Sequence, residues 1–252
     1  MTMQLLTFPV GVTIATLATM VGLGGGVLWV PYLVLVAGLK APVAIMTSLV
    51  IQIAGMASGG VATIRQEKTD IRLALVLAAS AFPGVAFGVW LQGVINAQSL
   101  VFLVGLACMT CGLAFVFARE DQHFFPVKKV SLRTVVPYLW TPPILSVITG
   151  LLSVGVGDFL VPVLRSRLRL RMDAAIGACL VVMTINACAA FSLHMLTGGS
   201  FSGRIALFGA TGALVGGQIG PRIADKVPDQ TLKEIFIYGL SLIGIHVLFN
   251  AV

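Results

Sequence analysis

Two glycine-rich segments inside apolar stretches are the part of this chain best suited to binding a small ligand. The first holds Gly24, Gly25 and Gly26, and the second holds Gly155 and Gly157. Helices that begin at such segments present free backbone N–H groups and a positive dipole end, and glycine lets a ligand approach the backbone closely. With half-helices starting near Val27 and near Asp158, this pattern predicts an anion site without a buried lysine or arginine. The alternative is that the glycines only allow close helix packing.

Asp158 is the only acidic residue well inside an apolar stretch. A carboxylate at the centre of a bilayer costs about 2.5–3.5 kcal/mol on insertion scales, so it must be paired, protonated or in contact with water. One interpretation is a proton-coupling carboxyl beside the bound anion. The other, compatible with the first, is an N-cap of the second half-helix.

Five polar side chains within predicted helices are candidates for lining the substrate site: Ser48, Gln52, Thr184, Asn186 and Gln218. Such residues also join membrane helices to one another, and this alternative stays open for each. His194 and His246 stand near predicted helix ends, so we expect both at the membrane interface.

Other chemistries have weaker support. The sequence contains no metal-ligand spacing and no phosphate-binding Walker loop, and the run from Gly22 to Gly26 lacks the strand–helix unit of a dinucleotide site. We therefore expect no metal, no cofactor and no enzyme activity. Cys108 and Cys111 form a Cys-x-x-Cys on one helix face. They are either small packing residues or a membrane redox pair.

The composition indicates that these residues lie in a lipid bilayer. Of the 252 residues, 58% are hydrophobic and only 10% are charged, whereas soluble domains carry about 25% charged residues. Eight apolar stretches can span or enter a bilayer: 8–38, 43–64, 73–95, 98–118, 135–164, 173–197, 204–221 and 230–252. The chain is therefore predicted to be an all-α polytopic membrane protein without a separate soluble catalytic domain.

The two halves of the sequence resemble each other, which indicates an internal duplication. An offset of 131 aligns Gly24 with Gly155, Gly26 with Gly157 and Pro31 with Pro162, and an offset of 132 aligns Gly84 with Gly216 and Gly88 with Gly220. We expect a first transmembrane repeat at 1–118, a cytoplasmic linker at 119–134 and a second repeat at 135–252.

Charge distribution decides how the repeats are oriented. If every stretch crosses once, lysines and arginines divide evenly between the two faces, against the positive-inside rule. If the first and fifth stretches enter and leave on one side, all of the 16 lysines and arginines except Lys40 and Arg204 share one face. This predicts two inverted repeats, each a glycine-tipped re-entrant or broken helix hairpin followed by three transmembrane helices, with both termini outside.

The net charge of +7 does not indicate nucleic-acid binding, because no basic helix or aromatic-basic motif accompanies it. Its most concentrated part is the alternating set Arg165, Arg167, Arg169 and Arg171. This loop either contacts anionic lipid headgroups or forms a cytoplasmic funnel for an anion. The expected partners are the lipid bilayer and a small anion, and a homodimer is compatible with the sequence.

The segments Gly22-Leu-Gly-Gly-Gly-Val-Leu-Trp-Val-Pro31 and Gly150-Leu-Leu-Ser-Val-Gly-Val-Gly-Asp-Phe-Leu-Val-Pro162 resemble motifs of the TauE/SafE sulfite exporter family, as does Ala213-Leu-Val-Gly-Gly-Gln-Ile-Gly220. The resemblance covers essentially the whole chain, although Asp158 stands where a further glycine is more typical. It implies secondary transport, driven by an ion gradient, that exports small sulfur-containing anions such as sulfite or sulfonates across the bacterial inner membrane. The alternatives are a passive anion channel of the same fold and a membrane thiol redox protein.

Overall fold

The computed structural model of the chain describes residues 2–117, 130–155 and 157–224, together with residues 238, 244–247 and 249. Within these ranges the side chains of some helical residues, Asp158 among them, lie outside the description. Most of the expected linker at 119–134 and most of the last apolar stretch at 230–252 also lie outside the described residues.

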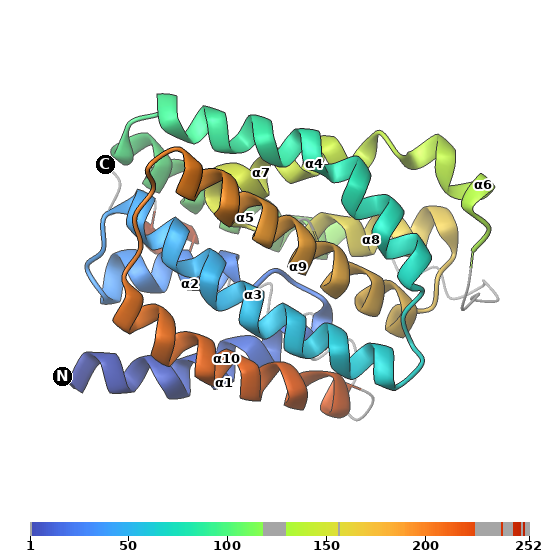
Figure 1. Cartoon of the computed structure of the whole chain (residues 1–252), viewed down its shortest axis with the longest axis horizontal. Helices are drawn as coiled ribbons and strands as arrows, with labels where there is room; N and C mark the ends of the chain where they lie inside the picture. Colours follow the sequence, from blue (N-terminus) through green and yellow to red (C-terminus); the bar gives the residue numbers. More distant parts are fainter. Residues whose placement is uncertain are drawn as a thin grey trace.

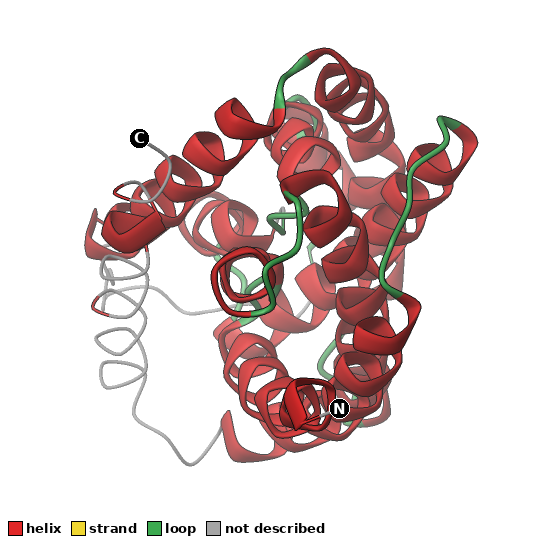
Figure 2. Ribbon diagram, turned by 90° about the vertical axis from the view of Figure 1, so that its left-hand side faces the viewer, coloured by secondary structure: helices red, strands yellow, loops and turns green. Residues whose placement is uncertain are grey.

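The elements of the described chain are all helices (Figure 1). In chain order they are α1 (Thr2–Val21), α2 (Gly26–Pro31) continued by a π-helical turn η1 (Tyr32–Val36), α3 (Ala41–Arg65), α4 (Ile71–Val94), α5 (Ala97–Phe117), α6 (Leu132–Val135) with the 3-10 turn η2 (Val136–Tyr138), α7 (Thr141–Leu152), α8 (Gly157–Leu168), α9 (Met172–Leu196) and α10 (Gly203–Ile223). Figure 2 views the same bundle from one end and shows the helices joined by short loops.

Two apolar stretches are each divided into a pair of helices by a break at the glycine-rich segments. Gly22 follows α1 with a φ of 78°, and Ser153 follows α7 with a φ of 61°. A left-handed residue after the last turn ends a helix, and the two residues are 131 positions apart, which is the register of the sequence repeat. After each break a short helix, α2 or α8, turns back toward the end of the bundle from which the preceding helix arrives (Figure 1).

Helix α1 packs along α10, and α4 packs along α7, through glycines that face a carbonyl oxygen of the neighbouring helix. A methyl group on any of these glycines would overlap that oxygen. The pairs are Gly216 with Val12, Gly220 with Thr16, Gly84 with Pro143 and Gly88 with Val147. Small residues let membrane helices approach this closely. The offset of 131 relates Val12 and Thr16 to Pro143 and Val147, and the offset of 132 relates Gly84 and Gly88 to Gly216 and Gly220. The α1–α10 and α4–α7 contacts are therefore equivalent in the two halves.

The centre of the bundle is formed by α3 and α9, which cross in opposite directions. A methyl group on Gly60 of α3 would lie 3.6 Å from Val181 of α9, and one on Gly177 of α9 would lie 3.3 Å from Thr63 of α3. Within the described residues, α3, α4 and α9 are the three helices long and apolar enough to cross a membrane. The exposed face of α4 carries large apolar side chains, including Phe87 and Trp90, as expected of a lipid-facing surface.

Basic residues concentrate at one end of the bundle. The ends of α3 and α10, the starts of α4 and α9, and α6 all lie at the right of Figure 1, and the starts of α3 and α10 lie at the left. The right-hand end therefore carries Arg65, Lys68, Arg72, Arg133, Arg165, Arg167, Arg169, Arg171 and Arg222. Lys40 and Arg204, the two residues that the charge pattern assigned to the opposite face, stand at the left-hand end.

Candidate functional site

The two glycine-rich breaks touch each other inside the bundle. We call residues 22–26 the first tip and residues 153–157 the second tip. A methyl group added to Gly24 would overlap the Cα of Gly155, and one added to Gly155 would lie 2.8 Å from the backbone nitrogen of Gly24. Only glycine at both positions lets the two backbones lie this close, so the sequence-predicted glycines do meet.

The glycines that begin the short helices also face the opposite tip. The expected half-helix starts near Val27 and Asp158 are found at Gly26 and Gly157. A methyl group on Gly26 would overlap the carbonyl of Ser153, and one on Gly157 would lie 2.6 Å from the carbonyl oxygen of Gly22. The two tips therefore contact each other in an equivalent way.

Gly25, in contrast, points away from the contact between the tips. A methyl group there would lie 3.3 Å from Cδ1 of Trp29 and 3.7 Å from Ile14. Trp29 is buried and meets Tyr32 edge to face, with ring centroids 5.7 Å apart. The role of Gly25 in the described structure is to let the first tip pass the Trp29 ring.

A buried polar cluster of three side chains, Ser48, Gln52 and Ser153, joins α3 to the second tip. Nε2 of Gln52 donates to the backbone oxygen of Ser153 at 2.7 Å, to the Oγ of the same serine, and to Ser48 Oγ at 3.2 Å. Ser153 Oγ donates to Ser48 Oγ at 3.2 Å. All three residues are at most 3% exposed. The cluster brings neutral hydrogen-bond donors to the place where the tips meet.

These side chains matter because the first turn of α2 uses its own amides. Val27 N–H donates to the Gly24 carbonyl at 3.3 Å, and Leu28 and Trp29 N–H groups donate to the Gly25 carbonyl at 3.1 and 2.8 Å. The expected cradle of free backbone amides at Val27 is therefore occupied in this arrangement. The polar side-chain groups beside this turn are the amide of Gln52 and the hydroxyls of Ser48 and Ser153.

Of the other predicted polar residues, Thr184 on α9 donates to the Leu180 carbonyl of its own helix at 2.7 Å. Asn186 and Gln218 have different surroundings. Asn186 on α9 is 1% exposed, and its Nδ2 has no hydrogen-bond partner among the described residues. Gln218 on α10 donates to the Ser58 carbonyl at 2.7 Å and accepts from Arg222 at 3.1 Å. Gln218 thus ties α10 to α3, whereas Asn186 is a buried donor on α9.

His194 lies near the end of α9, as expected, and its side chain is buried against α7. His194 is 2% exposed, and its Nε2 lies 2.8 Å from the carbonyl oxygen of Gly150 in α7. The side chain of a helical residue leans toward the helix N-terminus, so a residue near the end of α9 reaches back into the bundle. His246, in contrast, is exposed.

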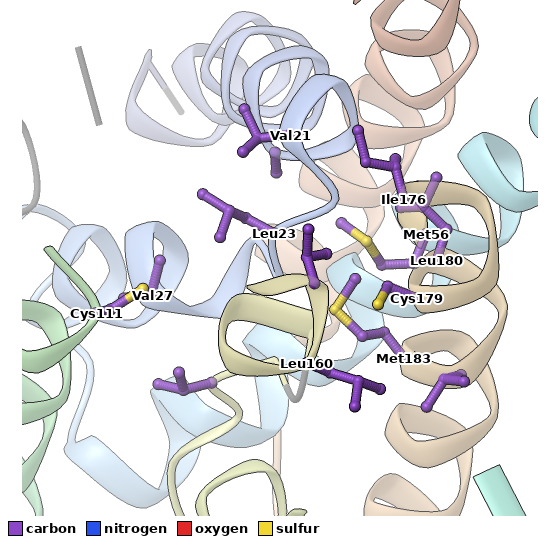
Figure 3. Close-up of a cluster of buried hydrophobic side chains, with 14 of the residues drawn as sticks. Val21, Leu23, Val27, Met56, Cys111, Leu160, Ile176, Cys179, Leu180 and Met183 are labelled. Carbon is purple, nitrogen blue, oxygen red and sulfur yellow. The ribbon is translucent and has the colours of Figure 1, made fainter. Parts of the chain in front are cut away.

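The cysteines are thiols rather than disulfides. Cys108 Sγ donates to the Val27 carbonyl at 3.3 Å, and Cys111 is fully buried on the same helix. Cys111 lies beside Val27 in Figure 3. Among the described residues there is also no cluster of three or more histidine, cysteine, aspartate or glutamate side chains suited to a metal ion.

Two residues of the tip region were not among the predicted site residues. Ser153 stands inside the second glycine motif but was passed over in favour of the glycines around it. Met183 on α9 places its sulfur 2.7 Å and 2.6 Å from methyl groups built on Gly155 and Gly157. The repeat register could have found it, because Met183 is 131 residues after Gln52.

Comparison with known proteins identifies the family. The family described as "Sulfite exporter TauE/SafE" matches residues 7–247 of the chain. The chain belongs to the TauE/SafE family. It is also similar to a protein of Bacillus subtilis (strain 168) described as "Probable membrane transporter protein YunE", with 22% identity over 263 residues that cover 96% of each chain. No solved protein structure matches.

Family membership and the long apolar helices together show a membrane-embedded transporter protein. The resemblance recognised from the glycine motifs is confirmed over nearly the whole chain. In this TauE/SafE protein, both motifs lie at the contact between the tips, Gly24 against Gly155.

Proposed function

We propose that the protein is a secondary transporter that exports small sulfur-containing anions, such as sulfite or a sulfonate, across the bacterial cytoplasmic membrane. The observation that carries the proposal is the contact of Gly24 with Gly155 beside the buried Gln52 cluster. Broken helices that meet in the membrane, one from each repeat, are where many transporters hold their substrate. The class of anion is supported by the description of the family.

The proposal includes two inverted repeats, at residues 1–118 and 135–252. Helices α3 and α9 correspond in the repeat register, and their contacts run in opposite directions, as inverted copies require. The α1–α10 contact and the α4–α7 contact each join a helix of one half to a helix of the other half, and the repeat register relates the two contacts. Each hairpin then enters from its own face, and the two tips meet between them.

An anion would bind by replacing hydrogen bonds that the cluster makes with itself. The Gln52 amide and the hydroxyls of Ser48 and Ser153 now bond to one another. A hydrogen bond to a charged group contributes about 1.5–3 kcal/mol, against about 0.5–1.5 kcal/mol for a neutral pair. We call the described arrangement, in which the tips touch, the closed state; binding an anion between the tips requires them to separate.

The charge-rich end of the bundle is proposed to face the cytoplasm, following the positive-inside rule. The α7–α8 hairpin arrives from this end (Figure 1). Arg167, Arg169 and Arg171 are exposed there, and a cluster of positive charge raises the local concentration of anions. This location favours loading of the anion from inside and its release on the opposite side.

Coupling to protons is assigned to Asp158. Its backbone is the second residue of α8, directly after Gly157 at the contact between the tips. A carboxyl in the membrane is expensive when charged, so a proton taken up outside after the anion has left lowers the cost of the return step, and this proton is released inside before the next anion binds. The proton gradient would then drive the anion outward.

The test uses purified protein in proteoliposomes with radiolabelled sulfite and a short-chain sulfonate, with and without an imposed pH gradient. Asp158→Asn is compared with Asp173→Asn, which removes an acid that is paired with Arg171 at 2.9 Å outside the tips. We expect gradient-driven flux in the wild type and in Asp173→Asn. Asp158→Asn should retain exchange but lose the response to the gradient.

Other outcomes select the alternatives. Flux that ignores the gradient in every variant would favour a passive channel with the same fold. A double Cys108→Ser, Cys111→Ser variant tests the thiol redox alternative. A transporter should keep its flux in this variant, because transport does not depend on the two thiols. Absence of flux for both anions in a well-folded sample would reject the proposed substrate class.

A further inference from the structure

The same position in the two halves carries different chemistry at the contact between the tips. The 131-residue register aligns Gln52 of α3 with Met183 of α9, and Gly26 with Gly157. A methyl group on Gly26 would lie 2.6 Å from Nε2 of Gln52, and one on Gly157 would lie 2.6 Å from Sδ of Met183. Both side chains therefore press on the start of a short helix, one with an amide and one with a thioether.

The surroundings extend this difference. On the Gln52 side are the hydroxyls of Ser48 and Ser153. On the Met183 side are Met56, Cys179 and Leu23, none of them more than 1% exposed. Figure 3 shows Met183, Cys179 and Met56 gathered on one side of Leu23 of the first tip. The region between the tips thus has a hydrogen-bonding face and an apolar, sulfur-rich face.

Helix α9 also carries a donor that the described chain leaves unused. Asn186 follows Met183 by three residues, and residues three apart are neighbours on a helix surface. Its Nδ2 is buried and has no partner among the described residues. A buried unpaired donor is rare in native proteins and calls for an acceptor beyond those that the described residues supply.

We propose that Met183 is a specificity-determining residue, and that its thioether forms the wall against which the apolar part of an anionic substrate packs. This inference rests on the proposed function. A compact oxyanion such as sulfite has hydrogen-bond acceptors on several sides, and a thioether cannot donate to them. An alkanesulfonate directs its oxygens at Gln52 and its hydrocarbon part at Met183. The site therefore prefers a short alkanesulfonate to sulfite.

The test compares kcat/KM for ethanesulfonate and for sulfite in proteoliposomes containing wild-type, Met183→Gln or Met183→Leu protein. Replacing the apolar wall by an amide is expected to lower the ethanesulfonate-to-sulfite ratio about tenfold, the size of effect that one apolar contact has on discrimination. Met183→Leu keeps an apolar side chain of similar size and should leave the ratio within about twofold. A ratio unchanged in Met183→Gln, or lowered equally by both variants, overturns the assignment.

A second measurement needs no variant and covers the case in which Met183→Gln does not fold. Wild-type KM is determined for methane-, ethane- and propanesulfonate. The apolar wall predicts that KM falls as the chain lengthens, and a KM that is constant or rises overturns it. If wild-type protein moves neither sulfite nor any sulfonate, the proposed function fails together with this inference. If it moves them without chain-length preference, only this inference fails.

Discussion

The contact between the tips predicts a defined cost for one methyl group at Gly24. The added carbon would overlap the Cα of Gly155 and lie 2.5 Å from its backbone nitrogen, whereas heavy atoms in contact stay about 3.5 Å apart, so the tips must separate by more than about 1 Å. Overpacking of this kind costs about 1–3 kcal/mol. At 25 °C this energy disfavours the closed state about 5- to 160-fold relative to states with separated tips.

Gly24→Ala is compared with Gly93→Ala, a control in α4 where an added methyl group meets nothing within 4 Å. We expect Gly24→Ala to lower the thermal unfolding midpoint in detergent and to reduce gradient-driven flux, because the closed state through which transport passes becomes less populated. Gly93→Ala should keep flux at the wild-type level, since alanine suits a helix interior better than glycine. If Gly24→Ala matches the control in both assays, the tips do not meet as described.

Three further perturbations follow from the packing. Gly216→Val and Gly84→Val should reduce the monodisperse yield in size-exclusion chromatography to a similar extent, because both glycines face a carbonyl at equivalent positions; loss in only one would contradict the equivalence. Asp70→Ala removes the cap that accepts from two backbone N–H groups of α4, and should lower stability by about 0.5–2 kcal/mol without changing flux. Asn186→Leu removes an unpaired buried donor, so it should raise the unfolding free energy by about 1–3 kcal/mol while weakening flux. A less stable Asn186→Leu protein would show that Asn186 has a partner outside the described residues.

The helix breaks could be predicted because they depend on local chemistry. A glycine cluster within an apolar stretch too long for one crossing indicates where the chain turns, and the half-helices begin at Gly26 and Gly157, each one residue before the expected position. The expected ends of a central helix also agree with the structure to within one residue, since α9 was expected at 173–197 and runs from Met172 to Leu196. Charge also assigned Lys40 and Arg204 to the end opposite the other basic residues of the described chain, where both are found.

The side-chain partners could not be predicted, because they depend on contacts between distant segments. The sequence presents Gln52 and Gln218 as equal candidates. In the structure Gln52 bonds to the second tip, whereas Gln218 bonds to Ser58 on α3. The sequence does not indicate which neighbouring helix provides the hydrogen-bond partner of a polar residue in an apolar helix. The residue type of Met183 gives no signal, since a methionine in an apolar helix is the ordinary expectation, and only its repeat position relative to Gln52 points to it.

The hydropathy pattern also does not indicate which helices pack against each other. In a membrane, a helix face that contacts lipid and a face that contacts another helix are both apolar. The pairing of α1 with α10 becomes visible only when the glycines of α10 are set against the backbone of α1. The duplicated register then explains the pairing of α4 with α7, because it places Gly84 and Gly216 at equivalent positions.

The exchange of helices between the halves also determines the order in which the protein can be assembled. Thr16 of α1 contacts Gly216 of α10, 200 residues later in the chain. At a synthesis rate of about 5–20 residues per second, α1 waits roughly 10 to 40 seconds in the translocation machinery or the lipid before its partner exists. Helix α4, in contrast, is joined by α7 after only about 60 residues, roughly 3 to 12 seconds at the same rate. Of the two glycine-packed pairs that join the halves, α4–α7 is therefore the first that can form during insertion, and a chain truncated before α10 leaves α1 without its principal neighbour.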